Sequence, residues 1–270
     1  MKKNNRKYSI CITTYFDKNF EKIGNLSLKG MEKYAKKYGF DIKLFNNITS
    51  NRPPAWNKIL IVQKLLEDPK KYDFIFWIDS DTLFWRFNED IRQEIEENKD
   101  FYLVKTDYLG MDLPLSGAFL IRNSEWSKQF LKGVWGLKKY TYHHWWENAA
   151  IDDLLGFKEI IKYNKYKLFF TGILYKINLK HQVTSFLNKI NLHKFLNKLF
   201  NNNTTKNLIT IETPKVNKNI EKVKWLDLKW DSLTRLDEDP NPIIQHYPAM
   251  SFEERLRRMT EDYKRINKKS

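Results

Sequence analysis

The sequence has few of the features that mark disulfide-rich, zinc-stabilised or membrane proteins. Its 270 residues include one cysteine, Cys11, which excludes an intrachain disulfide and a structural zinc site made of several cysteines. No apolar run reaches the roughly 18 to 20 residues that cross a bilayer. The basic first seven residues lead into a strand-like stretch and not into a signal-peptide pattern. We therefore expect a protein without a membrane anchor, in a reducing compartment, most simply the cytoplasm.

Glycine-rich phosphate loops are also lacking. None of the 9 glycines stands in the pattern G-x-x-x-x-G-K-[ST] or G-x-G-x-x-G. A phosphate ligand must then be bound by a metal or by side chains, because no glycine-rich backbone is available to hold it.

The net charge of +15 is concentrated in one part of the chain. Between Lys158 and Lys224 there are 14 lysines, 3 glutamates and no arginine, so this segment alone carries +11. A charge confined to a quarter of the protein indicates a basic insert or face. The lack of arginine, the usual bidentate ligand of bases and phosphates, argues against a nucleic-acid-binding protein.

The residues that are abundant predict a large core and an α/β fold. The chain is 41% hydrophobic and 15% aromatic, which excludes global disorder. Strand and helix patterns alternate over its first 80 residues, as in a doubly wound α/β sheet. The expected strands are residues 8–15, 41–45, 74–78, 100–105 and 117–122, and the expected helices are residues 25–38, 55–67, 126–135, 148–155 and 252–266.

We expect one domain over residues 1–270, with a basic insert at residues 160–224. Within the insert, Lys176 to Lys206 contains two short amphipathic patterns interleaved with lysines. Such helices can lie on an anionic membrane surface. Alternatively, their apolar faces pack onto the domain or onto a second subunit and leave the lysines solvated.

Two carboxylates stand where a buried strand is expected to end. Asp79 and Asp81 directly follow the apolar run FIFWI, and ligands of open α/β sheets bind beyond the carboxyl ends of strands. Carboxylates two residues apart can converge on one hard cation such as Mg²⁺ or Mn²⁺. The alternative is a polar turn in which Asp79 only caps a helix.

Five segments together resemble one enzyme family. PPAWNKILIVQKLL, YDFIFWIDSDTLF, SGAFLIRNSEWSKQFLKGVW, WENAAIDDLL and IIQHYPAM occur in the family's order. They resemble glycosyltransferase family 34, which has the GT-A fold and includes fungal galactosyl- and mannosyltransferases and plant xyloglucan xylosyltransferases. The resemblance implies a GT-A-type, mainly parallel mixed sheet flanked by helices. It also implies metal-dependent, retaining transfer of a sugar from a nucleotide diphosphate, with UDP expected, to a glycan or glycolipid hydroxyl.

The resemblance assigns a metal site for Mn²⁺ or Mg²⁺. Asp81 would bind the ion directly, Asp79 would hold the ion or the ribose, and His246 would be the third ligand. A neutral imidazole beside carboxylates suits Mn²⁺. The alternative for His246 is an interface histidine without a ligand.

The same resemblance assigns a donor site. Thr13, Thr14 and Tyr15 would meet the base and ribose, and Tyr15 would either stack on uracil or be a buried aromatic residue. Lys58 would reach the diphosphate unless it is only a solvated helix lysine. Two further donor-binding residues, from the segment SGAFLIR, are Ser116 and Gly117.

Glu147 and Asn148 are the expected catalytic residues. Placed at a helix start, they could face the anomeric carbon or the donor hydroxyls, whereas Glu147 could instead be only a favourable charge at the helix N-terminus. Front-face attack and double displacement with Glu147 as nucleophile both remain open. The other histidines, interpreted as surface or acceptor-side residues, are His143, His144, His181 and His193.

Some positions differ from the family pattern. Glu147 replaces a more usual aspartate, and the segment before Gly117 lacks the asparagine found in relatives. The lysine expected near the diphosphate is replaced by Ser251, although Arg255 is close in sequence. A nucleotidyltransferase that forms sugar nucleotides would share the fold, but it would need a glycine-rich basic loop near the N-terminus that this sequence lacks.

Overall fold

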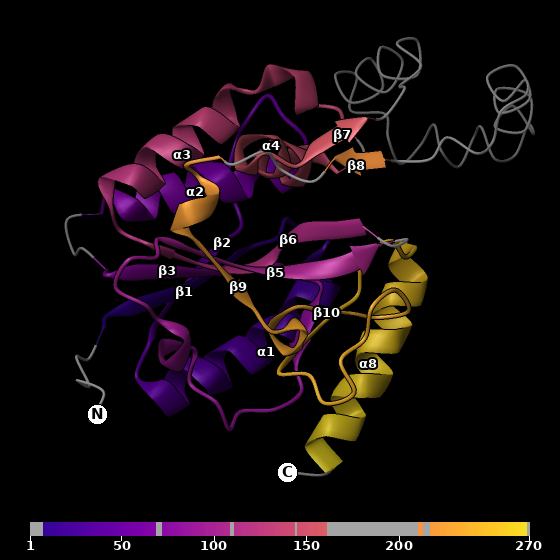
Figure 1. The fold of residues 1–270 in the computed structure, drawn as a ribbon. Helices are drawn as coiled ribbons and strands as arrows, with labels where there is room; N and C mark the ends of the chain where they lie inside the picture. Colours follow the sequence, from indigo (N-terminus) through magenta and orange to yellow (C-terminus); the bar gives the residue numbers. More distant parts are fainter. Residues whose placement is uncertain are drawn as a thin grey trace, which may run out of the picture.

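A six-stranded mixed sheet forms the centre of the molecule (Figure 1). The computed structural model describes residues 8–68, 72–108, 111–143, 145–160, 210–212 and 217–268. In spatial order the strands are β2 (Asp41–Phe45), β1 (Ile10–Tyr15), β3 (Phe74–Ile78), β6 (Met111–Arg122), β5 (Phe101–Tyr108) and β9 (Val223–Leu226).

Both strand orientations occur in this sheet. β1 is parallel to β2 and β3, and β9 is parallel to β5, whereas β6 is antiparallel to both β3 and β5. The expected mixed α/β fold is therefore confirmed. The strand expected at residues 117–122 is longer than predicted, because β6 begins at Met111. It pairs with β5 on both sides of an irregularity at residues 116–118, which have no partner in β5.

Helices cover both faces of the sheet. On one face lie α2 (Asn57–Leu66), α3 (Glu125–Gly136) and α4 (Trp146–Leu155), and on the other lies α1 (Glu21–Tyr38) (Figure 1). Side chains alternate between the two faces along β3, so that Ile75 and Trp77 join one core cluster and Phe74, Phe76 and Ile78 the other. This explains why the run FIFWI is apolar throughout.

A small second sheet pairs strands from the last 40 residues of the chain with a strand that closely follows β3. Its strands, in order, are β10 (Ser232–Leu233), β11 (Ile244–His246) and β4 (Thr82–Phe84). β11 is antiparallel to β4, with His246 opposite Thr82. The C-terminal helix α8 (Phe252–Lys268) packs beside α1 and β4 around a third apolar cluster that includes Met259 (Figure 1).

Most of the predicted basic insert lies outside the described residues. Its described parts include β7 (Lys158–Ile160) and β8 (Thr210–Glu212), which form a two-stranded antiparallel ladder. The lysines between Lys176 and Lys206, and the membrane contact expected of them, fall in the part that is not described and remain predictions. None of the described helices combines the length and the apolar character that a bilayer span requires.

Gly39 ends α1 in the left-handed conformation, with φ of 69°, which glycine adopts most readily. A Cβ at this position would meet no atom within 4 Å, so only backbone strain opposes substitution. We expect Gly39→Ala to lower the free energy of unfolding by about 1 kcal/mol. Gly136→Ala is the matched control, because it is equally uncrowded and lacks a positive φ. Urea unfolding should show little change or a small gain for that control, and equal behaviour of the two variants would contradict the assignment.

Candidate functional site

The chain turns sharply where β3 ends. The backbone N–H of Asp79 donates to the carbonyl of Gly117 at 2.7 Å, and the Thr82 hydroxyl donates to the carbonyl of Asp79 at 2.9 Å. β4 follows immediately, so Asp79 does not cap a helix and that alternative is wrong. The turn holds both carboxylates of the D-S-D segment at the carboxyl edge of the sheet.

Lys58 lies at the centre of a buried ionic cluster. Its side chain is 3% exposed, and its Nζ lies 3.0 Å from Asp79 Oδ1 and 2.9 Å from Glu147 Oε1. The ammonium also donates to the carbonyl of Ser116 at 2.8 Å. Burial opposes this charge, but the two carboxylates outweigh it and raise the pKa of Lys58. Lys58 is therefore not a solvated helix lysine.

Glu147 faces inward from the first turn of α4 and is 4% exposed. One of its oxygens pairs with Lys58, while Oε2 is buried and accepts no hydrogen bond from the described residues. Burial raises the pKa of Glu147, and the charge of Lys58 opposes that shift. A glutamate that only stabilised the N-terminus of α4 would face solvent. The buried position of Glu147 therefore favours a role in the candidate site.

Asn148 connects α4 to β6. Its Oδ1 accepts from the backbone N–H of Ser116 at 2.8 Å, and its Nδ2 donates to the carbonyl of Pro114 and to Asp152 Oδ2. These contacts use both ends of the amide. The observed arrangement therefore makes Asn148 a residue that holds Ser116 and Glu147 in place.

Asp81 and His246 form a second cluster beside the first. His246 Nε2 lies 3.3 Å from Asp81 Oδ1, and Arg255 Nε lies 3.2 Å from Asp81 Oδ2. Burial opposes the charge of Asp81, but His246 and Arg255 hold its pKa below the usual range. Ligand atoms of Asp79, Asp81 and His246 all lie within 4.8 Å of one another. The three residues predicted as metal ligands are thus brought together by the fold.

Asp231 completes this cluster and is absent from the residues predicted from the sequence. It is fully buried, and its Oδ1 lies 2.9 Å from His246 Nδ1 while its Oδ2 accepts from the backbone N–H of Ala118 at 3.0 Å. Burial opposes a charge on His246, yet Asp231 and Asp81 raise the pKa of the imidazole. A carboxylate on one ring nitrogen orients the other nitrogen toward a ligand. In the sequence Asp231 is only a lone acidic residue directly after Trp230. This pattern is too common to identify Asp231 as a site residue.

Gly117 lies against the imidazole. A Cβ built on it would come within 2.4 Å of His246 Cε1 and 2.8 Å of Asp231 Oδ2. No larger residue fits without moving the ring or the carboxylate. The position requires glycine because the side chains of His246 and Asp231 fill the space that a Cβ would occupy. The donor contact expected of Gly117 stays a prediction.

The residues at the end of β1 lie in different surroundings. The Thr13 hydroxyl is tied to β2 through a bond to the carbonyl of Lys43 at 2.9 Å. The Thr14 hydroxyl is buried without a partner among the described residues. Tyr15 is half-buried and packs beside the core, and burial raises its pKa against a hydrogen bond from Asn57.

His143 is buried and packs edge-on against Tyr140 at 5.4 Å between ring centroids, so its interpretation as a surface residue is wrong. The other three histidines without motif support, His144, His181 and His193, lie outside the described residues.

Comparison with known proteins supports the resemblance. A model of the galactosyl transferase GMA12/MNN10 family matches residues 11–99, which include Lys58, Asp79 and Asp81. Over these residues the chain is similar to that family. It is 25% identical over 166 residues to the probable alpha-1,6-mannosyltransferase MNN10 of Saccharomyces cerevisiae, and 29% identical over 120 residues to xyloglucan 6-xylosyltransferase 1 of Arabidopsis thaliana.

These matches cover 49% and 39% of this chain, and only 42% and 24% of the yeast and plant proteins. The chain therefore spans less than half the length of either relative. Among solved structures, a glycosyltransferase involved in the glycosylation of the major capsid of PBCV-1 is similar over 94% of this chain and 99% of its own, with a TM-score of 0.55 and 13% identity. This likeness shows the GT-A-type fold.

Replacement of Lys58 by an uncharged side chain would leave the buried Glu147 and the half-buried Asp79 without their shared partner. We expect Lys58→Met to lower the free energy of unfolding by about 3 to 5 kcal/mol. Adding Glu147→Gln removes one of the two unpaired negative charges. The double variant should therefore lose less unfolding free energy than the two single variants together, by about 1 kcal/mol or more.

Chemical denaturation of the four proteins in this double-mutant cycle measures the coupling. Lys64→Met serves as the control, because Lys64 lies on the exposed side of the same helix. Strict additivity of Lys58→Met and Glu147→Gln would show that the pair does not interact in solution.

Proposed function

We propose that this protein is a metal-dependent glycosyltransferase that moves a sugar from a nucleotide diphosphate, with UDP expected, to a hydroxyl of a glycan. The observation that carries the proposal is the convergence of Asp79, Asp81 and His246 within 4.8 Å beside the buried Lys58–Glu147 pair. The family match and the GT-A-type fold support the same reaction class.

The donor set fits Mn²⁺ or Mg²⁺. Two carboxylates and one imidazole suit such an ion and leave coordination positions for diphosphate oxygens. Because Asp231 holds Nδ1 of His246, the nitrogen offered to the ion is Nε2, which already faces Asp81. The bound ion would neutralise charge that develops on the leaving diphosphate.

Arg255 supplies positive charge at the place where the family lysine is missing. Its guanidinium reaches Asp81 from α8, one turn beyond Ser251, and its Nε also donates to the carbonyl of Tyr247 at 2.8 Å. We assign Arg255 to a diphosphate oxygen, because a guanidinium binds phosphate with directed hydrogen bonds.

Glu147 is the residue we place nearest the anomeric carbon. Its Oε2 is the oxygen left without a partner among the described residues, while Lys58 fixes the other oxygen and so orients the carboxylate. In double displacement, Oε2 would form a bond to the anomeric carbon as the diphosphate leaves. The acceptor oxygen would then replace Glu147 at that carbon, and its hydroxyl proton would pass to the released diphosphate. In front-face attack, the carboxylate would only stabilise positive charge at that carbon. Both routes retain the configuration.

The base, ribose and acceptor contacts follow from the same assignment. Thr14 and Tyr15 are proposed for the nucleoside, while Thr13 and Ser116 support the backbone around it. The acceptor is a glycan or a glycolipid. A cytoplasmic location and a peripheral contact with an anionic membrane remain predictions from the sequence.

The metal site can be tested by calorimetric titration of UDP. Affinity should rise markedly when Mn²⁺ replaces EDTA, and Asp81→Asn should abolish the gain. Asp231→Asn keeps the shape of the site but loses the charge that orients His246, so Mn²⁺ should bind about 10 to 100 times more weakly. Asp112→Asn is the control, because the Asp112 side chain is 66% exposed and pairs with Lys105 on the surface. Equal affinity of the unaltered protein for UDP in Mn²⁺ and in EDTA would refute the metal site.

The role of Glu147 can be tested with Glu147→Gln, which preserves shape and removes charge. We expect transfer from a UDP-sugar to fall about 100-fold or more, with UDP binding nearly unchanged. Glu253→Gln is the matched control, because Glu253 is an exposed acidic residue in the first turn of α8. Unaltered turnover of Glu147→Gln would reduce Glu147 to a structural partner of Lys58.

A further inference from the structure

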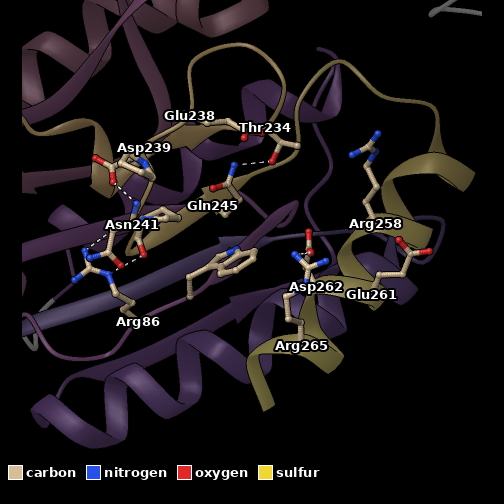
Figure 2. Close-up of a pocket in the computed structure, with 13 residues that line it drawn as sticks. Arg86, Thr234, Glu238, Asp239, Asn241, Gln245, Arg258, Glu261, Asp262 and Arg265 are labelled. Atoms are coloured by element: carbon tan, nitrogen blue, oxygen red, sulfur yellow. Dashed lines mark hydrogen bonds and ion pairs between the residues drawn. The ribbon is translucent and has the colours of Figure 1, made fainter. Parts of the chain in front are cut away.

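A cavity of about 650 Å³ lies between the small sheet, the loop at residues 234–242 and α8 (Figure 2). None of its lining residues belongs to the clusters around Lys58 and Asp81. One of its walls is Gln245, the residue before His246 in β11. Successive side chains of a strand point to opposite faces. The cavity therefore lies on the side of the small sheet opposite the imidazole.

Gln245 presents an unused acceptor to this cavity. The residue is 6% exposed, and its Nε2 donates to the Thr234 hydroxyl at 2.6 Å. Its Oε1 accepts no hydrogen bond from the described residues, and Figure 2 shows this oxygen on the side of the amide away from Thr234. An amide that is held at one end by Thr234 and is open to the cavity at its oxygen is suited to a ligand that donates hydrogen bonds.

The remaining lining combines an aromatic ring with charges of both signs. Trp85 contributes a half-buried indole, and three arginines and four acidic residues surround the space. In Figure 2, Arg258 and Glu261 extend from α8, and Glu238 and Asp239 come from the loop opposite. The charges nearly balance, which disfavours a phosphate-rich or polyanionic ligand.

We propose that this cavity is a second saccharide-binding site, which takes a neutral oligosaccharide. Sugar hydroxyls both donate and accept hydrogen bonds, as the mixed lining requires, and the apolar face of a sugar ring packs on an indole. The saccharide class follows from the lining alone. That the bound sugar is a remote part of the acceptor glycan rests on the proposed function.

The position of α8 supports that assignment. Arg255 contacts Asp81 at the reaction centre, and Arg258, about one turn further along the same helix, lines the cavity. A glycan that lies along this part of α8 would reach from the cavity to the reaction centre. The cavity would then hold the acceptor while its terminal sugar is exchanged.

Direct binding in the absence of nucleotide and metal tests the proposal. Saturation-transfer NMR with maltotetraose, cellotetraose and mannotetraose, at millimolar concentration in EDTA, should show binding of at least one of them. Trp85→Leu should weaken it tenfold or more. Arg258→Gln should also weaken it, and it keeps the test valid if Trp85→Leu fails to fold, because the Arg258 side chain is 32% exposed and lies outside the apolar core.

Two controls separate this site from other surfaces. Gln129→Leu alters a second cavity of about 320 Å³, whose lining contains no aromatic residue, and should leave binding unchanged. Asp81→Asn should also leave it unchanged, because this variant affects only the reaction centre. Absence of binding by all three tetrasaccharides would overturn the proposal, as would a loss of binding with Asp81→Asn or on addition of UDP and Mn²⁺. None of these outcomes would affect the metal-dependent UDP titration, which tests the proposed function separately.

Discussion

The rest of the site depends on the ion pairs that Lys58 forms with Asp79 and Glu147. Lys58 joins four elements, because it lies on α2 and contacts the end of β3 through Asp79, β6 through the carbonyl of Ser116, and α4 through Glu147. The positive charge of Lys58 opposes the rise that burial causes in the pKa of Asp79 and of Glu147. The polar centre is thus already assembled in the structure, as the proposed function requires.

A second centre, around His246, is built on a different physical basis. Here the imidazole is fixed by Asp231 behind it and by Gly117 beneath it, where only a hydrogen atom fits. Gly117 follows Ser116, whose carbonyl holds Lys58, so the two centres meet across one peptide group. Packing therefore sets the spacing between the proposed metal ligands and the proposed catalytic carboxylate.

The sequence predicts the parts of the site that follow long, regular elements. FIFWI is apolar on both faces, so the end of β3 and hence Asp79 and Asp81 could be located from the pattern. The family resemblance then selected Lys58, Glu147 and His246. Asp231 and the contact of Arg255 could not be predicted, because they depend on β4, β10 and β11, which have two or three residues each. Strands this short carry no periodicity, and their pairing is decided by contacts between distant parts of the chain.

The three-residue strand β11 has one further consequence. Gln245 and His246 are consecutive and face opposite sides, and a strand this short cannot move one of them and leave the other in place. A displacement of the β11 backbone would therefore move both side chains together. Any coupling through such a displacement would be equal in both directions, whereas ligands that leave β11 in place would bind independently. β11 therefore separates the cavity beside Gln245 from the cluster around His246 and contributes one side chain to each.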